Sequence, residues 1–189
     1  MLPGEPTDMM EQTRRLAESY IADPAQHTLV CAVLSSRAER VRNSQALGLV
    51  QRHGKETETV GVLTMCDLSA DPRRPSDPYW LLRDRLTGAS TDLPKLERGY
   101  VAVTNRDTQR LEGSSNEGGE NGGGGAATCG LVAANKDESV WFDEHLPGFG
   151  SNGKGLASIE SLLSKLAELM DGYARNGFKY QMVLEVCIS

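Results

Sequence analysis

Amphipathic segments and short apolar runs alternate along most of this 189-residue chain. Apolar side chains that recur every three or four positions predict helices, whereas short unbroken apolar runs predict strands that are covered on both faces. Helices are expected at residues 7–21, 44–51, 79–86, 137–145 and 156–173, and strands at 28–34, 59–65 and 99–104. Strands separated by helices indicate an α/β fold with a mostly parallel sheet flanked by helices.

Three segments call for separate interpretation. The stripe of residues 156–173 is interpreted as a core-packing helix, with a partner-binding helix as the alternative. Seven of the 16 residues in 112–127 are glycine, so that ordering them would cost too much entropy, and a disordered insertion is expected there. In the tail, alternating apolar residues from Met182 to Ile188 favour a strand over a helix.

Composition narrows the class of protein. The 20 basic and 26 acidic residues leave a net charge of −6, which argues against a nucleic-acid partner. No apolar run approaches the length of a transmembrane segment, and the first residues do not resemble a secretory signal. The four cysteines form no C-x-x-C pair and have no metal-ligand spacing with the three histidines, so reduced thiols and a cytoplasmic location are expected.

One carboxylate stands where an α/β sheet usually binds its ligand. Asp67 follows the apolar run 59–65, and ligands of parallel sheets bind beyond the carboxyl ends of the strands. An ionised aspartate only accepts hydrogen bonds, so its two oxygens could accept the ring N–H and the exocyclic amine of guanine together. The alternative is that Asp67 caps the turn into residues 69–72. Asn105, after the next apolar run, could contact a base, brace its loop or serve as a turn residue.

Taken together, three ordered segments resemble the GTPase domain of dynamin-family proteins. They are residues 43–47, residues 59–68, which end where the family has its T-K-x-D guanine-reading motif, and residues 98–106, which match its G-Y-x-x-V-x-N-R motif. Leu2-Pro3-Gly4 resembles the end of the family's D-x-P-G motif. Residues 142–147, Gly155 and the leucine-rich segment resemble the close of that domain, so the resemblance covers about residues 2–176.

The resemblance implies an incomplete, three-layer P-loop NTPase-like domain over residues 1–176, followed by an atypical tail, 177–189. It implies GTP binding and hydrolysis, self-association and membrane remodelling, in the cytoplasm or peripherally at membranes. By position, Thr64, Asp67 and the loop through Ala70 would lie at the guanine, and Asn105 and Arg106 would close over the base and ribose. Pro3 and Gly4 would lie near the γ-phosphate. The nucleotide-binding residues implied are Thr64, Met65, Asp67, Leu68, Ser69, Asn105, Arg106, Pro3 and Gly4.

The chain departs from the family in the parts that handle phosphate. Met65 stands where the family has lysine, Met1 stands where it has a metal-linked aspartate, and the chain contains no G-x-x-x-x-G-K-[ST] motif or switch segment. The glycine-rich residues 148–155 lack the spacing of a phosphate loop. Phosphoryl transfer depends on such contacts, so no catalytic residue is assigned, no hydrolysis is expected of this chain alone, and Mg²⁺ is expected only with a complete domain.

These departures are typical of a truncated, fragmentary or degenerate GTPase whose remaining strands would expose a sheet edge. The alternative is a non-catalytic interaction protein built on a remnant of the GTPase fold.

Overall fold

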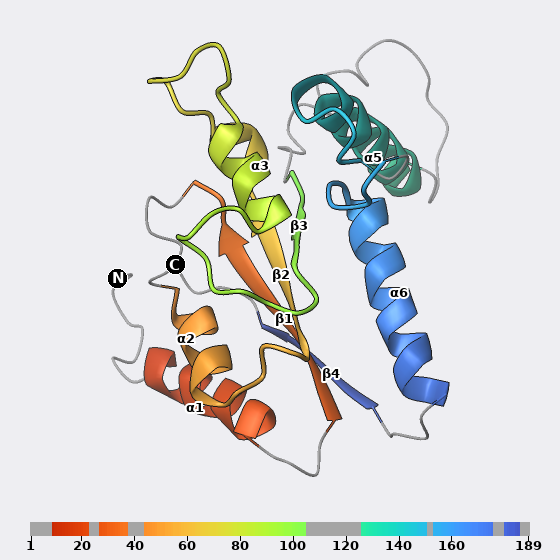
Figure 1. The fold of residues 1–189 in the computed structure, drawn as a ribbon. Coiled ribbons are helices and arrows are strands. Elements are labelled where there is room, and N and C mark those ends of the chain that lie inside the picture. Colours follow the sequence, from red (N-terminus) through yellow and green to blue (C-terminus); the bar gives the residue numbers. More distant parts are fainter. Residues whose placement is uncertain are drawn as a thin grey trace.

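The structure is a computed structural model that describes residues 9–22, 27–37, 44–104, 126–150, 153–175 and 180–185. The chain forms a four-stranded sheet with helices on both faces (Figure 1). The strands are β1 (His27–Ser35), β2 (Thr59–Thr64), β3 (Tyr100–Ala102) and β4 (Tyr180–Glu185). All pairings are parallel, and the spatial order is β3-β2-β1-β4. The helices are α1 (Met9–Ala22), α2 (Gln45–Arg52), α3 (Trp80–Thr87), α5 (Ala126–His145) and α6 (Ile159–Arg175), with a 3₁₀ turn, η2 (Cys66–Leu68).

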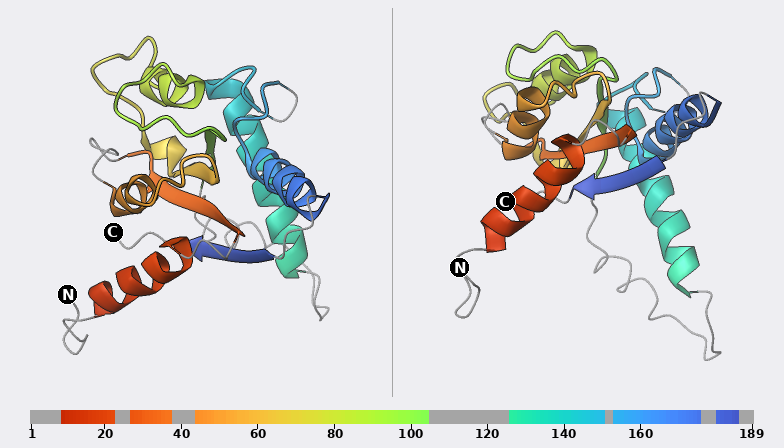
Figure 2. Two further views of the ribbon diagram at one scale, coloured as in Figure 1. Left: turned by 60° about the horizontal axis from the view of Figure 1, so that its bottom comes forward. Right: turned by 90° about the horizontal axis from the view of Figure 1, so that it is seen from below.

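Successive side chains of the strands enter two separate hydrophobic cores, one on each face of the sheet. Val30, Ala32 and Leu34 of β1 join the core beneath α1, α2 and α3, which also receives Trp141 and Phe142 from α5. The opposite core takes other strand residues and the apolar stripe of α6; its members include Leu29, Val60, Val62, Val101, Val103, Leu162 and Leu169. This alternation explains why the strands read as unbroken apolar runs, since each residue is covered from one side or the other. Viewed from below, the helices lie on both sides of the sheet (Figure 2).

The structure confirms the predicted α/β class and the parallel pairing. Part of the 156–173 stripe packs in the core as predicted, including Leu162 and Leu169, whereas Leu163 and Met170 are exposed. Three predicted boundaries were wrong. α6 begins at Ile159 rather than at residue 156, because the amides of Leu156 and Ala157 donate to the Phe149 carbonyl in the preceding loop. β3 ends at Ala102 rather than continuing to residue 104, because its chain then turns to contact Glu138. α5 begins at Ala126 rather than at 137, so the last two residues assigned to the glycine-rich insertion are helical. Residues 105–125, which hold the rest of that insertion, lie outside the described residues.

β4 lies beside β1, in register from Tyr180 opposite His27 to Glu185 opposite Ala32. The alternating pattern of the tail therefore predicted the correct element. β4 covers one edge of β1, so β1 is an interior strand and the outer strands of the sheet are β3 and β4.

None of the helices in the described part of the chain is long and apolar enough to cross a membrane.

Candidate functional site

The backbone reverses sharply where β2 ends. Met65 has φ 55° and ψ 37°, in the left-handed region that a residue with a side chain adopts uncommonly. The 3₁₀ turn follows at once, with the Leu68 amide donating to the Met65 carbonyl at 3.1 Å. A strained residue between a buried strand and a tight turn is a common feature of ligand-binding loops, and it directs the following side chains beyond the sheet edge.

Cys66 anchors this turn in the core. It is fully buried, its thiol donates to the Leu63 carbonyl at 3.1 Å, and burial raises the pKa of the thiol to about 12. Because a protonated, enclosed thiol is a poor nucleophile, Cys66 has a structural role here. Its neighbours point the other way: Met65 is 41% exposed and Leu68 is 54% exposed.

Asp67 lies between these two exposed apolar side chains. Its Oδ1 atom is buried and accepts no hydrogen bond from any residue that the structure describes. The contact made by this residue is through its backbone, whose carbonyl accepts from the Tyr79 hydroxyl at 3.4 Å. A carboxylate oxygen removed from water without a donor is unfavourable, so a ligand that supplied an N–H here would gain a strong, charge-assisted bond.

The hydrogen bonds of the following turn come from other residues. The Ser69 hydroxyl donates to the Cys66 carbonyl at 2.6 Å. The Asp71 carboxylate accepts from the Arg73 amide at 3.0 Å and from the indole N–H of Trp80 at 3.2 Å, and these bonds lower the pKa of Asp71. Within the described loop, the carboxylate of Asp67 is thus not engaged in turn formation.

Some of the remaining predicted site residues lie in the described part of the chain, and the others lie outside it. Thr64 and Met65 are tied to β1: the Thr64 hydroxyl donates to the Leu34 carbonyl at 3.2 Å, and the Ser35 hydroxyl lies 3.8 Å from the Met65 sulfur. The structure therefore brings Thr64, Met65, Asp67, Leu68 and Ser69 to one end of β2. Pro3, Gly4, Asn105 and Arg106 lie outside the described residues.

Glu138 is a second carboxylate near this edge, and unlike Asp67 it is a buried residue; sequence analysis did not identify it. It is 4% exposed, and its two oxygens accept from the amides of Thr104 and Ile159, each at 2.7 Å. Burial raises the pKa of Glu138, although these hydrogen bonds oppose the rise. The side chain joins the end of β3 to the start of α6. A single glutamate among the polar residues of a helix carries no sequence signal for such a role.

Aromatic rings fill the space between the loop after β2 and the end of α5. The ring of His145 stacks on Trp141 with centroids 4.6 Å apart, and Tyr79 meets both rings edge-on. Tyr79 in turn reaches the Asp67 carbonyl. The backbone of Asp67 is thereby held against a rigid cluster, which favours a fixed position for its carboxylate.

The glycine-rich loop at 148–155 does not offer its described amides to a ligand. The amides of Gly153 and Gly155 donate to the Gly150 carbonyl, and that of Lys154 donates to the Gly148 carbonyl at 2.9 Å. A phosphate cradle needs free backbone N–H groups, so these amides cannot form one in this conformation. Nor do the described residues contain a group of three or more histidine, cysteine or acidic side chains placed to hold a metal ion.

No model of a known protein family matches this sequence, and no curated protein matches it at a significant level. The function must therefore be inferred from the site itself.

Proposed function

We propose that this chain binds a guanine nucleotide at the carboxyl edge of its sheet and that Asp67 selects the base. The observation that carries the proposal is the buried Oδ1 atom of Asp67, which lacks a donor among the described residues. The resemblance of residues 59–68 to the guanine-reading segment of dynamin-family GTPases supports the same assignment, as does a parallel sheet flanked by helices.

The chemistry of the base explains the choice of guanine. Guanine presents a ring N–H and an adjacent amine on one edge, and a carboxylate can accept from both. Adenine has no such pair of donors and would leave the carboxylate without partners, which a buried site strongly disfavours. The exposed side chains of Met65 and Leu68 would supply apolar contact to the flat base, and the methionine is flexible enough to adapt to it.

The proposal does not extend to hydrolysis by this chain alone. Transfer of a phosphoryl group requires a cradle for the phosphates and a metal ion, and the sequence has no phosphate-loop motif. We expect GTP-dependent phosphate release no faster than the uncatalysed rate. Steady, Mg²⁺-dependent release that co-purifies with the protein would contradict this expectation.

The binding proposal is tested by titrating the full chain, labelled with ¹³C at its methionine methyl groups, with GTP, ATP and XTP. The Met65 signal should move with GTP and remain in place with ATP. Asp67→Ala should weaken GTP binding by roughly 2–3 kcal/mol, the usual range for a hydrogen bond to a charged group. Asp67→Asn should shift the preference toward XTP, because an amide can donate to the oxygen that replaces the guanine amine.

Asp84→Asn is the matched control, since Asp84 lies on α3 and belongs to no part of the proposed site. It should bind all three nucleotides as the unaltered chain does. If Asp67→Ala leaves the ratio of GTP to ATP affinity unchanged, Asp67 does not read the base and the proposal fails.

A further inference from the structure

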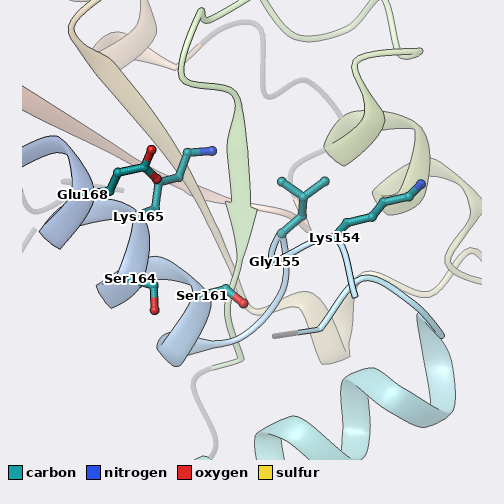
Figure 3. Close-up of a pocket in the computed structure, with 7 residues that line it drawn as sticks. Lys154, Gly155, Ser161, Ser164, Lys165 and Glu168 are labelled. Carbon is teal, nitrogen blue, oxygen red and sulfur yellow. The ribbon is translucent and has the colours of Figure 1, made fainter. Parts of the chain in front are cut away.

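A cavity of about 350 Å³ lies between α6 and the loop that precedes it (Figure 3). Ser161, Ser164, Lys165 and Glu168 line it from α6, where the spacings 161/164, 161/165, 164/168 and 165/168 of three or four residues place them on one side of the helix. Leu156 lines it from the loop. The volume falls at the lower end of the range of small-molecule sites, roughly 300–1,000 Å³.

Lys165 is the main charged group of this cavity. Its side chain is partly buried, and it forms no ion pair or hydrogen bond with any residue in the described part of the chain. A Cβ atom placed on Gly99 would lie 3.9 Å from the Lys165 nitrogen, so the ammonium group rests beside the start of β3. Burial lowers the pKa of Lys165, the Glu168 carboxylate opposes that effect, and the Arg98 guanidinium adds to it.

The other polar groups of the cavity differ in what they can offer. The Ser161 hydroxyl is already engaged, donating to the Ala157 carbonyl at 3.0 Å. The Lys154 ammonium lies over the Phe149 ring, 4.4 Å from its centroid, and extends away from Lys165 (Figure 3). Lys165 and Ser164 remain as donors, and Glu168 remains as an acceptor. A ligand that fits must therefore carry a negative charge and also hydrogen-bond donors of its own.

We propose that this cavity binds a small organic anion bearing hydroxyl groups, such as a phosphate ester or a hydroxy acid. The anionic group would lie at Lys165, hydroxyl groups of the ligand would donate to Glu168 and contact Ser164, whose hydroxyl points away from Lys165 (Figure 3), and the carbon skeleton would contact Leu156. Lysine suits this role because its ammonium is a compact charge with three donors. The site lies at the amino end of β3, whereas Asp67 lies beyond the carboxyl end of β2. The proposal of anion binding at Lys165 is therefore independent of the proposal of guanine binding at Asp67, and failure of one would not contradict the other.

The test is a titration of the ¹⁵N-labelled full chain with glycerol 3-phosphate, glycerate, inorganic phosphate and glycerol. The backbone amides of Gly155 and Leu156 should shift in a saturable way with glycerol 3-phosphate or glycerate, and neutral glycerol should leave them unchanged. Tighter binding of glycerol 3-phosphate would identify a phosphate ester as the preferred class, and tighter binding of glycerate a carboxylate. Saturable shifts with inorganic phosphate alone would overturn the need for hydroxyl groups.

Lys165→Met keeps most of the apolar stem and removes the charge, and it should weaken binding by about tenfold or more, as expected for the loss of a charge-assisted hydrogen bond. Lys136→Met, which alters an exposed lysine on α5, should leave binding unchanged. Ser164→Ala gives a milder second test in case Lys165→Met lowers the melting temperature. Equal shifts in Lys165→Met and the unaltered chain, no shift with either anion, or equal shifts with glycerol would each overturn the proposal.

Discussion

Two carboxylates near one edge of the sheet, one buried and one with a single buried oxygen, differ in the hydrogen bonds that they accept. Both oxygens of Glu138 accept backbone N–H groups, whereas Oδ1 of Asp67 receives none from the described residues. Glu138 therefore joins β3 to α6 in the folded chain, whereas Oδ1 of Asp67 remains able to accept a hydrogen bond from a ligand. At the scale of single residues, hydrogen-bond satisfaction separates a structural acid from a candidate for ligand recognition.

Glu138→Gln should lower the free energy of unfolding by roughly 1–3 kcal/mol, the cost of leaving a buried polar group unsatisfied. Glutamine has one acceptor oxygen, so either the Thr104 amide or the Ile159 amide would face an NH₂ group. Urea unfolding at neutral pH measures the change. Glu144→Gln, at an exposed position on the same helix, should leave the free energy of unfolding almost unchanged. Equal stability of the two variants would show that the bonds to Glu138 contribute little.

The same residue predicts a dependence of stability on pH. Burial raises the pKa of Glu138 above its ordinary value of 4.5, so the folded state holds this proton to a higher pH than the unfolded state does. The resulting stabilisation is complete below pH 4.5 and is lost as the pH rises through the raised pKa. The stability difference between the unaltered chain and Glu138→Gln should therefore shrink as pH rises across that window. A constant difference from pH 4 to pH 7 would contradict the shift.

At the scale of elements, the pairing of β2 with β3 depends on a glycine beneath an aromatic ring. Gly61 is paired with Tyr100, and a Cβ atom added to Gly61 would lie 2.1 Å from a carbon of the tyrosine ring. The tyrosine cannot easily move aside, because its hydroxyl donates to the Pro94 carbonyl at 2.8 Å. The ring covers the gap in the sheet that a residue without a side chain leaves.

Gly61→Ala should destabilise the protein by roughly 1–3 kcal/mol, since the added methyl overpacks a closed site. Gly48→Ala is the control: nothing lies within 4 Å of its added Cβ, and alanine in a helix is favoured over glycine by roughly 0.5–1 kcal/mol. Thermal and urea unfolding measure both variants. The double variant Gly61→Ala/Tyr100→Leu should lose less free energy of unfolding than the two single variants lose in sum, because removing the ring makes room for the methyl group. If the losses of the single variants simply add, the ring and the methyl group do not compete for space.

At the scale of the whole molecule, local patterns predicted the elements and failed to predict their distant partners. The apolar runs 28–34 and 59–65 identified two strands correctly, because a strand covered on both faces leaves a continuous apolar run. The alternation of apolar and other residues in the tail predicted a strand there. This pattern does not identify the strand's partner, which the structure shows to be β1. The position of Asp67 followed from its place after a strand. Glu138 was missed because its partners lie far from it in sequence.

The last prediction concerns this long-range pairing. Removing residues 176–189 deletes β4 and should expose the edge of β1, whereas removing only 186–189 leaves β4 in place. The Val30 amide donates to Glu58 on the side of β2. Because amides alternate along a strand, that of Cys31 should point toward β4. In the longer deletion the melting temperature should fall by about 5 °C or more, and the Cys31 amide should lose hydrogen-exchange protection before the Val30 amide. Identical melting and exchange in the two deletions would show that β4 does not support the sheet.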